Sequence, residues 1–334
     1  MFLNNSNGVK VSVSEKTFFV DPTNSDVGNA TLFLSHAHSD HARVFKNKTH
    51  LMTTETRDLL QKQENENLKT MKLNCRKKFE DCEITLKNAG HVLGSSQTII
   101  ENGERVVITS DFKLQDSILG EGAEILESDY LVIDSTFGLP KFSFPNREKT
   151  YEQIIKWTAE NLKEGKFVLL GGYALGKAQE LTKIINEFTK ETPLVYYKIF
   201  DNNKIYEKNS VKLGDFIKLN QNYSEGNILL MPPHLIKPEI IEVLSLMTGK
   251  KVATGICSGW FKEGFYRNKA RTFPLSDHAD YKSILHYIKK SKPKKVYTTH
   301  GFCKELAWII NKKLGIPSLP LKEAGQTHLQ DYND

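Results

Sequence analysis

Three histidines and an aspartate lie within six positions in the segment Ser-His-Ala-His-Ser-Asp-His, residues 35–41, which follows the apolar, β-prone run 31–34. Side chains alternate between faces in an extended segment, so His36 and His38 point the same way and can bind one cation. Asp40 and His41 follow as the chain turns out of the strand, and they can reach a second cation nearby. A chance cluster of histidines on a solvated loop is the alternative. It is improbable because the chain has only ten histidines in 334 residues. We therefore expect a metal site here.

One loop cannot supply every ligand of two cations, and further His and Asp residues do follow predicted strands. His91 comes after an alternating run, in a glycine-rich segment where the backbone can bend sharply. Asp111 ends the strand-like run 105–110, and His300 ends the run 295–299. These positions favour a site built at strand ends.

The expected ligands share imidazole or carboxylate chemistry and divide into two sets. One set is His36, His38 and His91, the other is Asp40, His41 and His300, and Asp111 can bridge them. Ligands of this kind without sulfur suit Zn(II), and Mn(II) or Fe(II) are alternatives. The predicted cofactors are thus two divalent metal ions, with Zn(II) favoured.

Composition limits the class of protein. The 334 residues are 39% hydrophobic and 26% charged, which suits a globular chain with two domains or one domain carrying a large insertion. We find no apolar run of about 18 residues and no signal-peptide pattern, so we expect a cytoplasmic protein without membrane contact. The four cysteines show no C-x-x-C spacing and are expected to be reduced, although Cys75 and Cys82 could pair if oxidised. A net charge of +6 is only weak evidence for a polyanionic partner.

Two local runs of basic residues say more than the total charge. Lys262, Arg267, Lys269 and Arg271 are interleaved with aromatic residues, a mixture that can bind phosphates and stack on bases. An edge strand with solvated charges and buried rings explains the same run equally well. The second run, over 289–295, is expected to be a solvated helix-to-strand connection.

The predicted elements change character along the chain. Residues 1–111 alternate short strands with turns, with one helical stretch near 55–64. From residue 147 onward helices and buried-type strands alternate, which predicts a parallel sheet flanked by helices. A helix over 281–290, the strand ending at His300 and a closing helix over 303–314 follow. Because Asp111 and His300 must meet at one metal pair, we interpret the block of alternating helices and strands that begins at residue 147 as an insertion into a single catalytic domain.

The motifs resemble a known family. The H-x-H-x-D-H loop with its downstream ligands is similar to the metallo-β-lactamase fold, an α/β four-layer αββα sandwich with metals at the sheet edges. Asp134 in L-V-I-D-S-T-F-G, His278 in P-L-S-D-H-A-D and His300 in Y-T-T-H-G resemble motifs A, B and C of the β-CASP nucleases, whose extra α/β domain caps the active site. The implied catalytic domain comprises residues 1–146 and 256–334, and the implied cap is 147–255.

Narrower motifs resemble one group within that family. Residues 137–140 (F-G-L-P), 172–180 (G-Y-A-L-G-K-A-Q-E), 257–260 (C-S-G-W) and 275–280 (L-S-D-H-A-D) look like those of DNA ligase-associated exonucleases, relatives of the eukaryotic DNA cross-link repair nucleases. The resemblance spans about Asp21 to Leu314. Any single motif is weak, since H-x-H-x-D-H also occurs in glyoxalases and lactamases, but motifs A, B and C in order are specific.

The resemblance implies metal-dependent hydrolysis of phosphodiester bonds. Two cations polarise the scissile phosphate and activate a water. Asp40 is expected to be both a metal ligand and a catalytic residue in this step. His278 is expected to stabilise or protonate the departing oxygen, with Asp134 fixing its tautomer. Asp21, in F-F-V-D-P, is expected to hold a ligand histidine or the metal-binding loop itself, although an Asx turn before Pro22 explains it as well.

Several residues are expected to bind the phosphates of nucleic acid. Lys177 begins a helix after Gly176, where its ammonium and the free N–H groups can hold a terminal phosphate; an ordinary first-turn lysine is the alternative. The small-residue turn at Ser258 and Gly259 is expected at the junction of cap and catalytic domain. Lys269 and Arg271 complete the predicted set of nucleic-acid contacts.

The predicted function is a DNA exonuclease of DNA repair that prefers single strands and is directed by a 5′-phosphate. DNA ligase or a helicase is the implied protein partner. An RNA-processing nuclease of the cleavage-and-polyadenylation or ribonuclease J type is the alternative, because His300 matches the RNA-cutting branch where the animal cross-link repair enzymes carry valine. A small-molecule hydrolase of the glyoxalase type is a further alternative. It would need neither the cap domain nor motif B, so the presence of both argues against it. A catalytically inactive scaffold would have lost ligands, and all seven are present.

Overall fold

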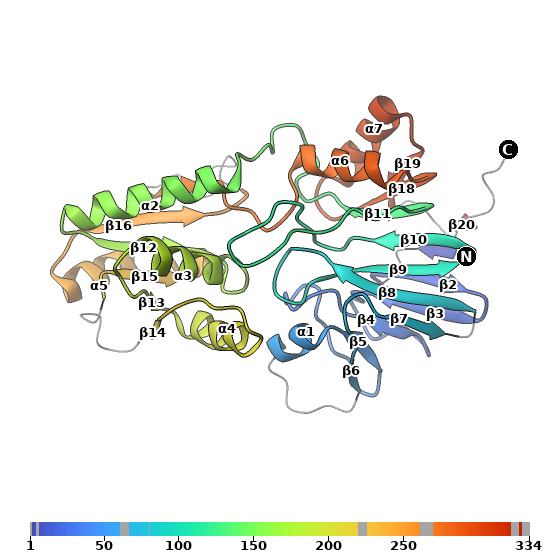
Figure 1. Ribbon diagram of the computed structural model, residues 1–334, viewed down its shortest axis with the longest axis horizontal. Helices are drawn as coiled ribbons and strands as arrows, with labels where there is room; N and C mark the ends of the chain where they lie inside the picture. The colour runs from blue at the N-terminus through green and yellow to red at the C-terminus, as the bar shows by residue number, and fades with distance from the viewer. Residues whose placement is uncertain are drawn as a thin grey trace. The chain divides into compact units, whose positions relative to one another are not determined.

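The computed structural model describes residues 2–4, 7–60, 67–79, 81–219, 226–260, 270–321 and 327–328. The chain divides into two compact units, whose elements are labelled in Figure 1. Unit 1 comprises Met1–Gln115, Gly122–Ser143 and His278–Asp334, and unit 2 comprises Asp116–Glu121 and Phe144–Asp277. No helix in the described ranges combines the length and apolar character needed to cross a membrane.

Unit 1 contains two seven-stranded sheets. The first has the order β20-β1-β2-β3-β4-β5-β6. Its strands are β1 (Phe2–Asn4), β2 (Val9–Val13), β3 (Lys16–Val20), β4 (Thr31–Phe33), β5 (His50–Met52), β6 (Leu68–Thr70) and β20 (Thr327–His328). The short helix α1 (Thr54–Leu59) contacts β6.

The second sheet has the order β19-β18-β11-β10-β9-β8-β7. Its strands are β7 (Arg76–Phe79), β8 (Cys82–Asn88), β9 (Ser96–Asn102), β10 (Glu104–Ile108), β11 (Tyr130–Asp134), β18 (Lys295–Thr299) and β19 (Ser318–Pro320). The strands from β7 to β10 form an antiparallel meander, and β10, β11, β18 and β19 pair in parallel.

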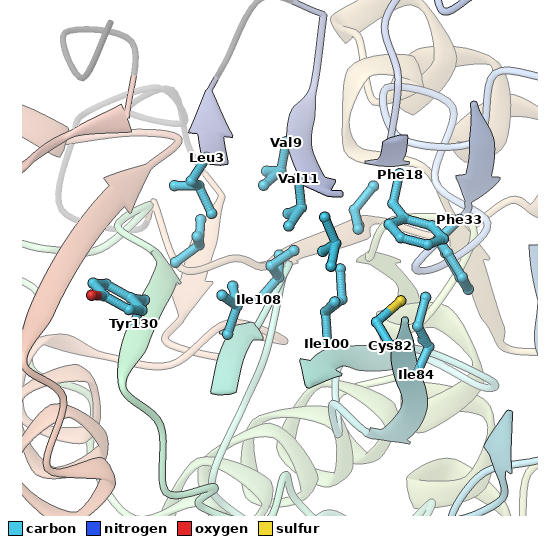
Figure 2. Close-up of a cluster of buried hydrophobic side chains, with 14 of the residues drawn as sticks. Leu3, Val9, Val11, Phe18, Phe33, Cys82, Ile84, Ile100, Ile108 and Tyr130 are labelled. Carbon is cyan, nitrogen blue, oxygen red and sulfur yellow. The ribbon is translucent and has the colours of Figure 1, made fainter. Parts of the chain in front are cut away.

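The core of unit 1 lies between these two sheets (Figure 2). Strand β2 alternates buried and half-buried residues, so Val9 and Val11 face inward as a half-buried strand requires. In Figure 2 they face Ile100 and Ile108 of the second sheet. Burying such side chains stabilises the fold by about 1.5–3 kcal/mol each relative to leaving them exposed.

Helices cover the other face of the second sheet. Strands β11 and β18 are buried at every position, which is the pattern of parallel strands covered on both faces. Helix α6 (Tyr281–Ser291) starts at Asp280, whose side chain accepts a 2.8 Å hydrogen bond from the Ser283 amide as an N-cap. Helix α7 (Cys303–Leu314) ends at Gly315 in the left-handed conformation. Both helices bury apolar side chains in one cluster with β11 and β18.

Unit 2 is a single parallel sheet of order β14-β13-β15-β12-β16-β17. Its strands are β12 (Phe167–Gly171), β13 (Leu194–Val195), β14 (Ile217–Lys218), β15 (Ile228–Met231), β16 (Val252–Cys257) and β17 (Arg271–Phe273). Its helices are α2 (Arg147–Lys163), α3 (Lys177–Phe188), α4 (Tyr197–Lys208), η2 (Pro233–Leu235) and α5 (Pro238–Thr248). The helix–strand alternation from residue 147 thus does form a parallel sheet.

The borders of the units differ in detail from the expected ones. Unit 2 runs to Asp277, whereas the sequence suggested a return to the catalytic domain at residue 256. The reason is that β16 pairs with β12 and β17 pairs with β16, so the chain stays in the parallel sheet beyond that point. The helix expected near 55–64 is described as α1 over 54–59, and its expected end falls outside the described residues.

Candidate metal centre

The candidate ligands all belong to unit 1 and follow the ends of its strands. The 35–41 loop follows β4, His91 follows β8, Asp111 follows β10, and His300 follows β18 directly. His300 itself has a positive φ of 59°, a conformation that turns the chain sharply at the end of the strand. Residues far apart in sequence therefore meet at one place.

His91 is carried by a loop whose glycine allows very close packing. Gly90 has a φ of 66°, and a Cβ there would lie 2.6 Å from the Lys113 carbonyl oxygen and the Ala123 amide nitrogen. Only glycine fits such an approach without moving the backbone. The loop geometry that aims His91 therefore depends on Gly90.

The first set of donors is His36, His38, His91 and Asp111, whose donor atoms all lie within 4.8 Å of one another. His38 Nδ1 is 3.1 Å from His36 Nε2 and 3.0 Å from His91 Nε2. Two nitrogens bound to one tetrahedral cation stand about 3.4 Å apart, so these imidazoles are spaced as ligands of one ion are. Asp111 Oδ2 is 3.6 Å from the Nε2 atoms of His36 and His91.

The second set of donors is His41, Asp111 and His300. His41 Nε2 lies 3.6 Å from Asp111 Oδ2, and the His41 and His300 rings are 4.9 Å apart. Asp40 is more peripheral, because its Oδ2 is 3.8 Å from His41 Nε2 and its side chain is 78% exposed. Asp111 thus takes part in both sets, and Asp40 lies at the solvent side of the second.

The charge distribution supports a cation in each set. Burial, followed by the charges of the neighbouring histidines, holds the pKa of His36 well below its ordinary value, so its ring is neutral and offers a lone pair. Burial also opposes charge on His41, but the Asp111 carboxylate, and after it Asp21, outweigh burial and raise the pKa of His41 to about 10. The second set therefore attracts positive charge. Buried carboxylate and imidazole donors without sulfur fit two divalent ions.

Asp21 holds the ligand loop and one ligand together. Its Oδ1 accepts a 2.7 Å hydrogen bond from the Ser35 amide, and its Oδ2 accepts a 2.6 Å bond from Ser35 Oγ. His41 Nδ1 lies 2.8 Å from the same Oδ2, which leaves His41 Nε2 facing Asp111. Ser35 Oγ also lies 2.8 Å from His36 Nδ1. Sequence reasoning missed Ser35, although its position directly before His36 was a signal for such a role.

His278 and Asp134 form a pair beside the candidate metal ligands. His278 Nδ1 is 3.0 Å from Asp134 Oδ2, and His278 Nε2 is 3.7 Å from Asp111 Oδ2. Asp134 also accepts hydrogen bonds from the Thr136 amide at 2.9 Å and its hydroxyl at 2.6 Å. Burial opposes the charge of Asp134, but the hydrogen bond and charge of His278, the charge of His300 and the Thr136 bond together outweigh burial and lower the pKa of the carboxyl. The pair thus directs Nε2 of His278 toward the centre, and Thr136, which the sequence analysis did not select, fixes the carboxylate.

The expected phosphate contacts lie in unit 2. The Lys177 ammonium is buried and forms a 2.7 Å ion pair with Asp277 Oδ2, a partner that the sequence analysis did not foresee. Ser258 is buried, and its Oγ accepts a 3.1 Å hydrogen bond from the Trp260 amide next to Gly259. Arg271 is exposed in β17. Lys262, Arg267 and Lys269 lie outside the described residues. The role of this set in phosphate binding remains a prediction.

Comparisons with known proteins give independent information. The family model of a Zn-dependent metallo-hydrolase RNA specificity domain matches residues 267–317. A probable DNA ligase of Opitutus terrae is 28% identical over 75% of this chain, which spans only 24% of that protein. An RNase J-like protein of Methanocaldococcus jannaschii is 25% identical over 84% of this chain and 83% of its own length.

One solved structure has a fold similar to that of this chain. A protein of unknown function from Enterococcus faecalis V583 superposes with a TM-score of 0.61 over 91% of this chain and 95% of that one, at 13% identity. These matches confirm the predicted α/β metallo-β-lactamase sandwich with its inserted α/β block. These similarities support the predicted resemblance of the chain to the β-CASP group of metallo-β-lactamase-fold nucleases.

Proposed function

We propose that this chain is a two-metal nuclease that degrades single-stranded DNA from a 5′-phosphorylated end. The observation that carries the proposal is the position of Asp111. Its Oδ2 lies 3.6 Å from the Nε2 atoms of His36, His41 and His91 and 3.7 Å from that of His278. A single carboxylate oxygen shared by two donor sets and by a non-ligand imidazole suits a hydrolytic centre in which metals and a proton donor meet.

The two donor sets would hold one divalent ion each. His36, His38 and His91 would bind the first, His41, Asp40 and His300 the second, and Asp111 would serve both. Bound ions of this kind act as Lewis acids toward a phosphate and make a water acidic enough to attack at neutral pH. The protein supplies the rest: Asp21 and Ser35 orient the ligand imidazoles, and burial of His36 keeps its ring unprotonated.

His278 would act as the proton donor to the departing oxygen. Its Nδ1 is held by the ionised Asp134, so the proton available for transfer is on Nε2, the nitrogen that faces Asp111. A carboxylate in this position stabilises the imidazolium and fixes the ring, as general acid catalysis requires. The leaving group would receive this proton when the phosphodiester bond breaks.

The choice of DNA rests on similarity rather than on the site. The protein named a probable DNA ligase supports action on DNA, and the motifs of residues 172–180 and 257–260 resemble those of ligase-associated exonucleases. An RNA-processing nuclease is the second candidate. It is favoured by the RNase J-like relative, by the name of the matched family model, and by His300.

One experiment tests both candidates. End-labelled DNA and RNA strands of one sequence, with a 5′-phosphate or a 5′-hydroxyl, are incubated with the protein and Zn(II), Mn(II) or Mg(II). The expected result is stepwise loss of nucleotides from 5′-phosphorylated DNA, with little change for the hydroxyl form. Faster cleavage of RNA assigns the second candidate. Equal cleavage of closed circular and linear strands contradicts the exonuclease assignment, and the Asp111→Asn variant controls for contaminating nucleases.

A further inference from the structure

We propose that the outward faces of helices α6 and α7 form a binding surface for single-stranded nucleic acid that begins beside the metal centre. The surface consists of Lys282, His286, Lys289 and Lys290 on α6 and Lys304, Trp308 and Lys312 on α7, and we call it the α6–α7 face. The inference rests on the proposed nuclease function and adds to it a contact region outside the metal centre.

Both helices start next to residues of the centre. Asp280, the N-cap of α6, comes two residues after His278, and α7 begins at Cys303, three residues after His300. The start of α7 is tied to the centre because Cys303 Sγ donates a 3.0 Å hydrogen bond to the His300 carbonyl. The first turns of the two helices are thus fixed relative to the ligands.

The two helices also pack on one side of the same sheet. They bury Ile284 and Ile288 from α6 and Leu306 and Ile310 from α7 in one cluster. Lys313 of α7 donates a 3.1 Å hydrogen bond to the Tyr281 hydroxyl at the start of α6. Figure 1 shows the two helices together beside β18 and β19. Their solvent-facing sides therefore lie on the same side of unit 1.

Trp308 is a large aromatic side chain on the solvent-facing side of α7. Its side chain is 62% exposed, and among the described residues of unit 1 it is the one large apolar side chain that is exposed. Lys304 and Lys312 stand four residues before and after it, so the three side chains follow one stripe with about 6 Å between neighbours along the axis. A single exposed ring needs no explanation by itself, but a ring placed between two cations at one-turn spacing fits a specific ligand.

The two helices have a strong excess of positive charge. They carry the six exposed lysines 282, 289, 290, 304, 312 and 313 against one acidic residue, Glu305. A basic stripe of this kind attracts a polyanion.

The chemistry of the face selects a single strand. Lysine ammonium groups bind backbone phosphates without regard to sequence, and an exposed tryptophan stacks on a base. Bases present their faces to a protein ring when they are unpaired, whereas a duplex stacks them on each other. At the start of α7, Lys141 Nζ lies 5.5 Å from the Phe302 ring, which continues the same mixture of cation and ring toward His300. The strand would thus run from the metal centre along α7.

Equilibrium binding of a labelled strand tests this inference. All proteins carry His278→Ala, which leaves every metal donor in place and slows cleavage, and they are loaded with metal. Fluorescence anisotropy of a 20-nucleotide single strand is measured for Trp308→Ala, Trp308→Phe and Lys304→Gln/Lys312→Gln. The control is Lys69→Gln/Lys72→Gln, which removes two exposed lysines at β6 of the first sheet.

We expect Trp308→Ala to weaken binding at least about fivefold, because one base loses its stacking partner. Trp308→Phe should retain most of the affinity. The double lysine variant should reduce the salt dependence of log K by about 1.4, since two phosphate contacts of a single strand disappear. Affinities within twofold of the Lys69→Gln/Lys72→Gln control for all α7 variants would overturn the proposal.

Two further measurements separate this inference from the nuclease proposal. Hydrolysis of bis(p-nitrophenyl) phosphate by the metal-loaded wild-type chain tests the metal centre alone, because this small substrate does not need the α6–α7 face. The α7 variants in the wild-type background should hydrolyse it at the wild-type rate. If no phosphodiester is hydrolysed but the α7 variants still lose strand affinity, the inference stands and the nuclease proposal fails. If Trp308→Ala changes the molar mass in light scattering and leaves strand affinity unchanged, the face binds protein and the inference is wrong.

Discussion

Asp134 Oδ2 and His278 Nδ1 lie 3.0 Å apart although 144 residues separate them in sequence. The bond joins the last residue of β11 to the residue that follows the inserted unit. Asp134 is held on its other side by the Thr136 amide and hydroxyl, so the carboxylate has little freedom. The arrangement is that expected of the proposed proton-transfer pair, which is separate from the candidate metal ligands around it.

His278→Ala and Asp134→Ala should each lower the cleavage rate by about two orders of magnitude or more, because general acid catalysis or its orientation is lost. Metal content should remain that of the wild type, since neither residue is an expected ligand. Single-turnover cleavage and elemental analysis of the same preparations are the measurements. Wild-type rates in both variants would show that the roles assigned to motifs A and B are wrong.

Asp134→Asn should move the alkaline limb of the rate profile to lower pH. The general acid works only when His278 is protonated, so the rate falls as pH rises through the titration of the pair. The hydrogen bond to His278 lowers the pKa of the Asp134 carboxyl, and by reciprocity the carboxylate stabilises the protonated imidazole. Removing its charge therefore lets His278 lose its proton at lower pH. The measurement is the pH dependence of kcat. If the alkaline limb of Asp134→Asn lies at the same pH as that of the wild type, the role of His278 as general acid is contradicted.

Asp111→Asn should reduce the metal content of both donor sets, whereas Asp40→Ala should affect mainly the second. The difference follows from position, because Asp111 Oδ2 lies 3.6 Å from ligand nitrogens of both sets and Asp40 approaches only His41. Elemental analysis after dialysis against a weak chelator measures the effect. Two tightly held ions in Asp111→Asn would exclude the shared role.

Gly90→Ala should destabilise the protein and disturb His91. A Cβ at this position would lie 2.6 Å from two backbone atoms, and the φ of 66° adds strain for any other residue. Gly103→Ala is the matched control, because Gly103 has a φ of 68° with nothing within 4 Å of the added Cβ. Denaturant unfolding should show a loss of about 1 kcal/mol for the control and clearly more for Gly90→Ala. Equal losses in the two variants would mean that close packing at Gly90 is unimportant.

Arg147→Ala should destabilise unit 2 by about 3–5 kcal/mol, because the Glu180 carboxylate remains buried without its charged partner, while Asp277 keeps Lys177. The guanidinium is buried, forms a two-bond pair with Glu180 and lies 3.4 Å from Asp277 Oδ1. Lys156→Ala, which removes an exposed pair with Glu160, is the control and should cost less than about 0.5 kcal/mol. The free energy of unfolding in urea measures both, and similar values would refute the importance of the buried cluster.

The sequence by itself indicated which residues could bind metal and where several of the helices lie, although it gave no signal for α4. His36 and His38 were recognisable because a two-residue period places them on one side of an extended segment, and α6 and α7 were predicted with their ends nearly correct because apolar residues recur at helical spacing. Asp111 and His300 could be selected because each ends a run of strand-forming residues. All these signals are local in the chain.

The tertiary structure alone decided which of these residues meet and which are occupied by other partners. The sequence suggested Asp111 as a bridge between the two donor sets, but only the structure shows that its Oδ2 faces the His278 imidazole as well as three of the candidate ligands. Nothing in the sequence indicated that the Lys177 ammonium pairs with Asp277, one hundred residues away. The end of unit 2 at Asp277 depends on β16 and β17 joining its sheet, and the exposure of Trp308 depends on which side of α7 packs against β18. Contacts of this kind depend on strand pairing and burial across the whole fold, so a pattern read along the chain cannot contain them.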